Sequence, residues 1–229
     1  MRAAVFLAAS LCGFSVQARV LDFHSDIRLA KSGELTVTER ISVQAQGKTP
    51  GLVRELPQAA RVVDVIRDGH PEPYALDAGR LRIGGAGVAE GRHLYQVTYR
   101  CARRVAFLAD HDALHWNLRG GERITAEVVL PVSVPAREIK VEVVTGARGE
   151  QGGDYQSFVR DGRAAFRGKD GMAIVVRFPK GVVAEPGIGQ RARWFFSDYF
   201  GALLVLAMLG LTAWVLVVMA RMSARSRGY

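Results

Sequence analysis

The densest group of chemistry-bearing side chains lies between residues 110 and 117. The run reads Asp-His-Asp-Ala-Leu-His-Trp-Asn, and its candidate site residues are Asp110, His111, Asp112, His115 and Asn117. Imidazole and carboxylate groups bind metal ions and also act as general acids and bases. In an extended chain successive side chains alternate, so the two histidines fall on one face and the two aspartates on the other. All four could therefore reach one metal ion only if the chain turns here.

A structural interpretation competes with this catalytic one. Carboxylates in loops commonly accept hydrogen bonds from nearby backbone amides, and a strand that follows the loop would bury Trp116. The sequence offers no second ligand cluster and indicates no cofactor. We therefore expect a structural segment and keep a metal-dependent or acid–base enzyme centred on Asp110, His111, Asp112 and His115 as the alternative.

Two further polar features are also expected to be structural. Asp22, His24 and Asp26 alternate along the chain, which is typical of the solvated face of a strand. Cys101 would be the one cysteine left after removal of a signal peptide, so the mature chain could form no internal disulfide. Nearby arginines would suit a reactive thiol, but a buried structural cysteine is the more common outcome.

Both ends of the chain carry apolar segments. Residues 1–18 combine an early positive charge, an apolar run and a small-residue exit, which predicts a cleaved secretory signal peptide. Residues 199–220 contain no charged side chain and would span about 33 Å as a helix, enough to cross a bilayer. The sequence therefore predicts one transmembrane helix at 199–220.

The flanks of this helix indicate its orientation. Aromatic residues from Trp194 to Phe200 suit the headgroup layer, and the arginines after the helix come without an acidic residue. With a secretory signal, this predicts a bacterial inner-membrane protein with an extracytoplasmic N-terminal domain and a cytoplasmic C-terminus. The predicted parts are a signal peptide at 1–18, an extracytoplasmic domain at 19–180, a stalk and juxtamembrane segment at 181–198, the transmembrane helix at 199–220 and a basic cytoplasmic tail at 221–229.

Short alternating segments determine the predicted fold. Residues 34–43 place Leu35, Val37, Ile41 and Val43 on one face, which indicates a half-buried strand that forms a hairpin with residues 20–29. Further apolar β-branched runs recur at 62–66, 81–83, 93–100, 124–130, 139–144 and 172–178. Turn-forming pairs separate many of them, and no long helical period precedes the membrane span. The sequence predicts an all-β antiparallel sandwich followed by one C-terminal transmembrane helix.

Composition narrows the range of partners. The formal net charge is +9, but the basic residues are mixed with Asp and Glu and form no dense tract. This pattern argues against nucleic-acid binding. Besides the membrane, we expect an envelope protein or an anionic lipid or glycan as a partner.

The order of these segments resembles the N-terminal domain of the YciQ-like predicted bacterial membrane proteins, a domain of unknown function. The matching segments are 23–27, 33–39, 67–69, 95–100, 110–117 and 178–181, with Asp-His-Asp-Ala-Leu-His-Trp-Asn the most specific. Members of that family are longer, so the resemblance implies either a short variant or a piece of a longer protein. It implies a fold and a topology but no catalytic residue.

The leading functional hypothesis is a membrane-anchored module for binding or scaffolding in the bacterial envelope. It rests on a β-rich domain, a stalk and a single span without a convincing catalytic set. The sequence alone does not identify the ligand.

Overall fold

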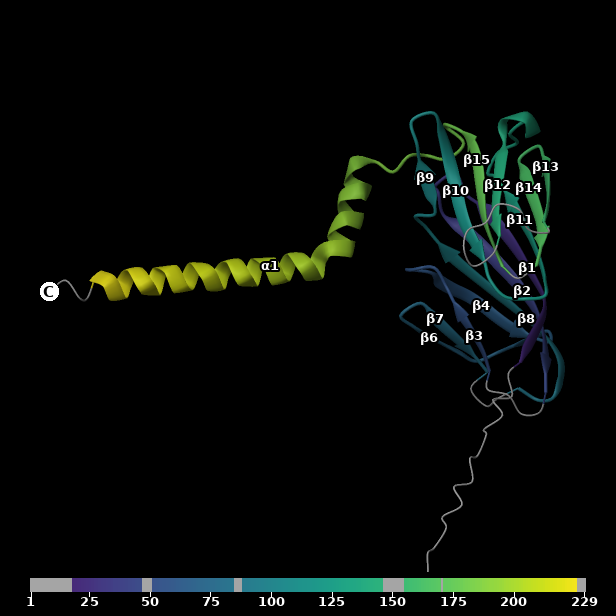
Figure 1. Ribbon diagram of the computed structural model, residues 1–229, viewed down its shortest axis with the longest axis horizontal. Helices are drawn as coiled ribbons and strands as arrows, with labels where there is room; N and C mark the ends of the chain where they lie inside the picture. The colour runs from purple at the N-terminus through teal and green to yellow at the C-terminus, as the bar shows by residue number, and fades with distance from the viewer. Residues whose placement is uncertain (1–17, 47–50, 85–87, 146–154, 170, 226–229) are drawn as a thin grey trace, which may run out of the picture. The chain divides into compact units, whose positions relative to one another are not determined.

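The computed structural model describes residues 18–46, 51–84, 88–145, 155–169 and 171–225 (Figure 1). The chain divides after Ala184 into two compact units. The first holds all the described strands, and the second holds helix α1, Ile188–Arg225. The predicted signal peptide at 1–18 falls almost wholly outside the described residues.

The described strands of the first unit form three β-sheets. The largest has eight strands in the spatial order β13 (Gln156–Arg160), β14 (Arg163–Gly168), β11 (Arg123–Val129), β1 (Arg19–Leu29), β2 (Leu35–Ala45), β8 (Gly91–Cys101), β4 (Arg61–Arg67) and β5 (His70–Pro71). The second has the order β12 (Lys140–Thr145), β15 (Met172–Pro179), β10 (His111–Leu118) and β9 (Val105–Phe107). The third has the order β3 (Leu52–Glu55), β7 (Arg80–Ile83) and β6 (Tyr74–Asp77). A short 3-10 turn, η1 (Ala136–Glu138), precedes β12.

Alternating burial explains the long central strands. In β2 the side chains of Leu35, Val37, Ile41 and Val43 are buried, as the period of two predicts. The β1–β2 hairpin closes at Gly33, whose φ of +80° favours glycine because it lacks a Cβ atom. The predicted hairpin is thereby confirmed.

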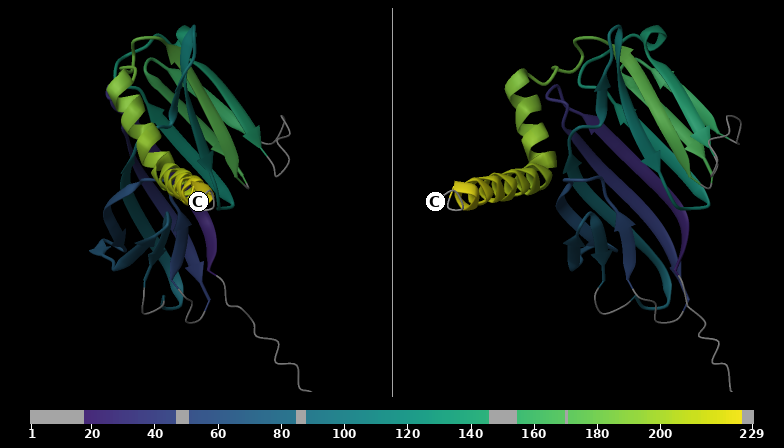
Figure 2. Two further views of the ribbon diagram at one scale, coloured as in Figure 1. Left: turned by 90° about the vertical axis from the view of Figure 1, so that its left-hand side faces the viewer. Right: turned by 60° about the vertical axis from the view of Figure 1, so that its left-hand side comes forward.

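The three sheets share one core. A single cluster of buried apolar side chains draws on the large sheet, the four-stranded sheet and the three-stranded sheet. Figures 1 and 2 show the two smaller sheets beside different halves of the large one. The predicted fold class, a mostly antiparallel all-β domain followed by an apolar helix, is confirmed. Its exception is the parallel pairing of β1 with β11, from Asp22 opposite Arg123 to Arg28 opposite Val129.

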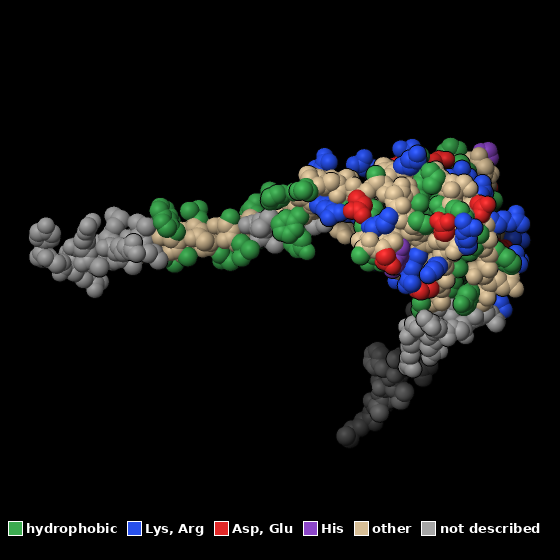
Figure 3. All heavy atoms as spheres, turned by 90° about the horizontal axis from the view of Figure 1, so that it is seen from above, with side chains coloured by type: hydrophobic (Ala, Val, Ile, Leu, Met, Phe, Trp, Pro, Cys, Tyr) green, Lys and Arg blue, Asp and Glu red, His purple; other side chains and the backbone are tan. Residues whose placement is uncertain are grey.

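Helix α1 begins earlier than the predicted span. Pro186 and Gly187 precede it, and after Gly189 no glycine or proline follows until the apolar segment, so the helix occupies residues 188–198 of the predicted stalk. Its window from Tyr199 to Leu216 has a mean hydropathy of 2.1 and is long and apolar enough to cross a membrane. Figure 3 shows apolar side chains along this helix and mixed charges over the visible face of the β-rich unit.

Candidate functional site

Strand β10 contains most of the candidate residues from the sequence. It begins at His111, while Asp110 lies in the preceding bend. The side chains of Asp112, Leu114 and Trp116 are buried, whereas those of His115 and Asn117 are exposed. The imidazole Nδ1 of His111 lies 2.7 Å from Asp110 Oδ1, and this hydrogen bond lowers the pKa of the Asp110 carboxyl. The alternation separates the histidines from Asp112, as an extended chain requires.

The carboxylate of Asp112 is held in the interior by a lysine. The Nζ atom of Lys180 donates to Asp112 Oδ1 at 2.9 Å. Two buried polar atoms, Asp112 Oδ2 and His111 Nε2, have no hydrogen-bond partner among the described residues. Because these neighbours lie on opposite faces of β10, they do not face one ligand. Within the described ranges, no three His, Cys, Asp or Glu side chains lie close enough to hold a metal ion.

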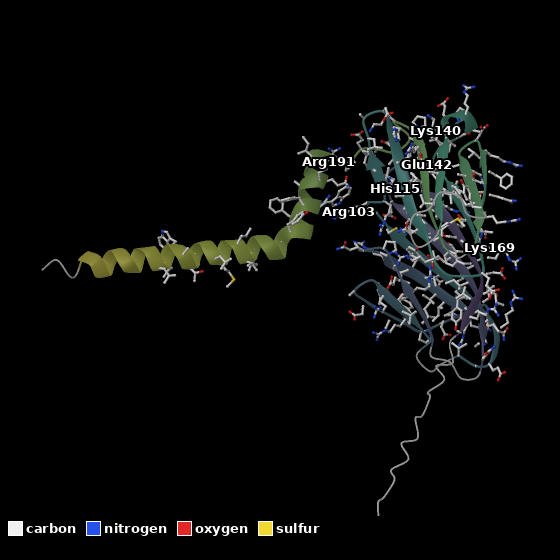
Figure 4. The ribbon with its side chains drawn as sticks, in the orientation of Figure 1. Arg103, His115, Lys140, Glu142, Lys169 and Arg191 are labelled. Atoms are coloured by element: carbon white, nitrogen blue, oxygen red, sulfur yellow. The ribbon has the colours of Figure 1, made fainter. Side chains whose placement is uncertain are left out.

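A cleft of about 540 Å³ lies where β10 and the three-stranded sheet meet the large sheet. Strand β9 pairs with β10 only as far as Leu114, so the second half of β10 is left beside the cleft. The lining residues come from four strands and the turns that follow them: Glu39, Val53, Arg54, Glu55, Leu56, Pro57, Tyr99, Arg104, His115, Trp116, Asn117, Arg119 and Gly120. Of the candidate residues from the sequence, the cleft gathers His115 (Figure 4) and Asn117, and not Asp110, His111 or Asp112.

A buried ionic triad lies beneath this cleft. Arg54 donates to Oε2 of Glu39 from Nε at 3.1 Å and from Nη2 at 2.8 Å. The hydroxyl of Tyr99 donates to the other oxygen, Oε1, at 2.8 Å. The side chain of Glu39 is only 5% exposed and that of Arg54 only 16%. Burial, followed by the nearby Glu39 carboxylate, raises the pKa of Tyr99 well above its usual value, so the phenol remains a donor.

Arg54 also connects the triad to the rim of the cleft. Its Nη1 atom donates to the backbone carbonyl of Arg119 at 3.0 Å, and its guanidinium lies 4.8 Å from the centre of the Phe23 ring. These bonds use three of the five guanidinium N–H groups, which leaves two without a hydrogen-bond acceptor among the described residues.

The charge of the cleft is positive. Arg54 is balanced by Glu39, and Arg119 lies 3.4 Å from Glu55 in an exposed pair. Arg104 is half-buried, and no acidic side chain of the described residues lies within ion-pair distance of it. An anionic group entering this cleft would therefore meet at least one uncompensated cation.

Three of these cleft residues, Glu39, Arg54 and Tyr99, were not predicted as site residues from the sequence. Glu39 shares the apolar face of β2 with Leu35, Val37, Ile41 and Val43, so its burial could have been inferred from the same period of two. A lone acidic residue on such a face predicts a buried partner. Nothing in the sequence identifies that partner as Arg54 on a separate four-residue strand, or adds Tyr99.

The polar row on β1 has structural partners. His24 Nδ1 lies 2.8 Å from the Thr125 hydroxyl, and Asp26 accepts from Arg28. Asp22 forms ion pairs with Arg92 at 3.3 Å and Arg123 at 2.8 Å. These contacts agree with a structural role, although the three side chains lie on a half-buried strand face and not on a fully solvated one.

Cys101 is a buried free cysteine, and burial raises the pKa of its thiol from 9.0 to about 11. The folded state therefore binds this proton more tightly than the unfolded chain, so the resulting stability is complete below about pH 9 and is lost as the pH rises through about 11. Between about pH 8.5 and 10.5 the free energy of unfolding should fall by about 2 kcal/mol more in the wild type than in Cys101→Ala. Urea unfolding at both pH values measures this difference, and parallel losses in the two proteins would contradict it.

Comparison with known proteins now identifies the family. Residues 19–178 match the family described as "Predicted membrane protein (DUF2207) N-terminal domain". The chain belongs to this family. The DUF2207 match covers nearly the whole β-rich unit, confirms the resemblance found in the sequence, and agrees with the apolar helix that follows.

Relatives of this DUF2207 chain are known by sequence and by structure. The uncharacterized protein YciQ of Escherichia coli (strain K12) is 25% identical over 225 residues, which cover 84% of this chain and 34% of that protein. The chain thus spans about a third of that relative. An M1 zinc metallopeptidase from Deinococcus radiodurans is 12% identical with a TM-score of 0.45, covering 69% of this chain and 42% of that one. Native yeast LTA4 hydrolase is 11% identical with a TM-score of 0.49, covering 70% and 29%.

Proposed function

We propose that the β domain is an extracytoplasmic binding module, anchored in the bacterial inner membrane by α1, and that its cleft binds an anionic ligand. The observation that carries this proposal is the cleft in which Arg104, which has no acidic partner among the described residues, lies near the buried Glu39–Arg54–Tyr99 triad. The orientation is supported by the aromatic residues before the span and the arginines after it.

The triad supports a functional role because it is a costly way to build a core. Removing two charges from water costs several kcal/mol per ion, and apolar residues of similar volume often stabilise a protein at least as well. A buried charge network beside a cleft is therefore a candidate functional site. Its role here is to fix Arg54 so that its remaining N–H groups and the Arg104 guanidinium present donors to a carboxylate or phosphate.

The test uses the full chain in detergent micelles with two anionic probes, glucuronate and glycerol 3-phosphate, and a neutral probe, glucose. At least one anion is expected to bind and to raise the melting temperature, whereas glucose is not. Arg104→Gln should weaken that binding by about tenfold, because a charge-assisted hydrogen bond contributes roughly 1.5 to 3 kcal/mol.

The matched control is Arg160→Gln. Arg160 is an exposed arginine on β13, at the far edge of the large sheet, and it does not line the cleft. Its loss should leave anion binding unchanged. Equal effects of the two substitutions, or no anion binding, would refute the cleft as the site. Trypsin added to intact spheroplasts should digest the β domain, and its protection would refute the orientation.

A further inference from the structure

The backbone of β3 has a free edge along the cleft. Leu56 N donates to the Gly79 carbonyl at 2.8 Å, and the β3–β7 register continues this pairing through Arg54 with Leu81 and Leu52 with Ile83. Hydrogen-bonded residues alternate along an antiparallel pair. The N–H and C=O groups of Val53 and Glu55 therefore point away from β7. Among the described residues no strand pairs with this edge, and both residues line the cleft.

The opposite wall of the cleft, formed by β10, also has unpaired backbone groups, over a shorter length. His115 N donates to the Arg104 carbonyl at 3.2 Å, which ends the pairing between β10 and the chain around β9. By the same alternation, the backbone groups of Asn117 point toward this unpaired side. In the described part of the chain no strand covers Asn117 there, and Asn117 also lines the cleft. Backbone donors and acceptors thus lie on two walls of one cleft.

We propose that the cleft binds an extended acidic polypeptide segment, which adds to the free edge of β3 as a further strand. This inference rests on the proposed function and names its ligand. A strand beside β3 would lie about 4.8 Å from it, with amide groups at the spacing that Val53 and Glu55 require. A lipid headgroup or a glycan lacks that regular alternation of N–H and C=O groups, so the exposed edge favours a polypeptide.

The charges of the cleft select the side chains of this segment. Glu39 is already paired with Arg54, and Glu55 with Arg119, which leaves the guanidinium of Arg104 to bind a carboxylate. Side chains in a strand alternate between its two faces. A segment with acidic residues at every second position would therefore direct all of its carboxylates to one face, whichever direction the strand runs.

The first experiment measures fluorescence anisotropy of a labelled pentapeptide, Val-Glu-Val-Glu-Val, with the full chain in micelles. The acidic peptide should bind at least about tenfold more tightly than its Val-Gln-Val-Gln-Val counterpart. Two N-methylated forms of the acidic peptide then test backbone pairing. One form is N-methylated at residues one, three and five, and the other at residues two and four. Since only alternate N–H groups face β3, one form should lose about tenfold in affinity and the other should retain the affinity of the parent peptide.

The second experiment alters the protein edge itself. Val53→Pro removes an N–H group that faces the cleft, and proline is tolerated on edge strands where that group is unpaired. The matched control is Leu76→Pro. By the β6–β7 register, the Leu76 N–H also points off the same sheet, but at its other edge and outside the cleft. Val53→Pro should weaken binding of the acidic peptide by about tenfold, whereas Leu76→Pro should leave that binding unchanged.

The outcomes separate this inference from the proposed function. If both N-methylated peptides bind as well as the parent peptide, strand addition is wrong, while acid-dependent binding would still support an anion site. If glucuronate or glycerol 3-phosphate binds and the acidic peptide does not, a glycan or a lipid headgroup replaces the polypeptide as the ligand. If neither anions nor the peptide bind, both proposals fail. Should Val53→Pro not fold, as judged by its melting curve, the N-methylation comparison on the wild-type chain still decides.

Discussion

Replacing Trp116 by alanine is expected to lower the free energy of unfolding by about 3 to 5 kcal/mol, as removal of a large buried aromatic side chain generally does. Trp116 is only 5% exposed and belongs to the shared core of the three sheets. It lies on the same face of β10 as Leu114 and Leu118, both fully buried, so its removal would leave a cavity in the core beneath the cleft. Urea unfolding of the full chain in micelles, followed by far-ultraviolet circular dichroism, measures this loss.

Two histidine variants of the same strand provide the comparison. His111→Ala and His115→Ala should each cost within the ordinary range of about 0.5 to 3 kcal/mol, because neither side chain lies in the core. A stoichiometric divalent ion that copurifies with the wild type, stabilises it and is lost in the double histidine variant would overturn the structural interpretation of β10. It would favour the metal-dependent enzyme instead.

Arg54→Leu is the second change with a large expected effect, a loss of about 3 to 5 kcal/mol, because it leaves the Glu39 carboxylate buried without a counter-ion. Among the described residues, the Tyr99 hydroxyl would remain the only hydrogen-bond donor to that carboxylate. Replacing all three members, as Glu39→Leu, Arg54→Leu and Tyr99→Phe together, should recover most of this loss, since no buried polar group is then left unsatisfied. The same urea experiment compares the single and triple variants.

A second arginine–glutamate pair in the same cleft serves as the control. Arg119 and Glu55 are 3.4 Å apart, with side chains 74% and 68% exposed. Arg119→Leu should therefore change stability by no more than about 0.5 kcal/mol. If Arg54→Leu proved as mild as Arg119→Leu, the triad would not be the buried network described above, and its support for a functional cleft would be lost.

The long strands could be predicted because the alternation of apolar and polar residues along each strand shows which face is buried. Residues 34–43 and 93–100 alternate for long enough that the buried face is evident without knowledge of the partner strand. Strands of three or four residues, such as β3, β6 and β9, contain at most two residues per face and give no period. The parallel pairing of β1 with β11 could not be predicted either, because the local residue pattern of a strand determines neither its partner strand nor the direction of pairing.

The candidate site was predictable only in part, for a related reason. His115 and Asn117 were identified from their residue types, and both line the cleft. Their neighbours in space are Glu39, Arg54 and Tyr99, which come from three other strands. The residues around each of them in the sequence do not indicate a site. The cleft exists because a four-residue strand with little hydrophobic pattern docks against the large sheet, and such docking is decided by tertiary packing.

The parallel pair also has a consequence for the order of folding. In the proposed topology β1 is the first of the described strands to leave the export channel, yet one of its two neighbours, β11, lies about a hundred residues later in the chain. The β1–β2 hairpin can form early, while the other edge of β1 remains open until β11 has been translocated. An open strand edge on a partly exported chain can pair with another chain. In the proposed topology, the most sequence-distant pairing among the described strands therefore leaves an edge open to aggregation during export.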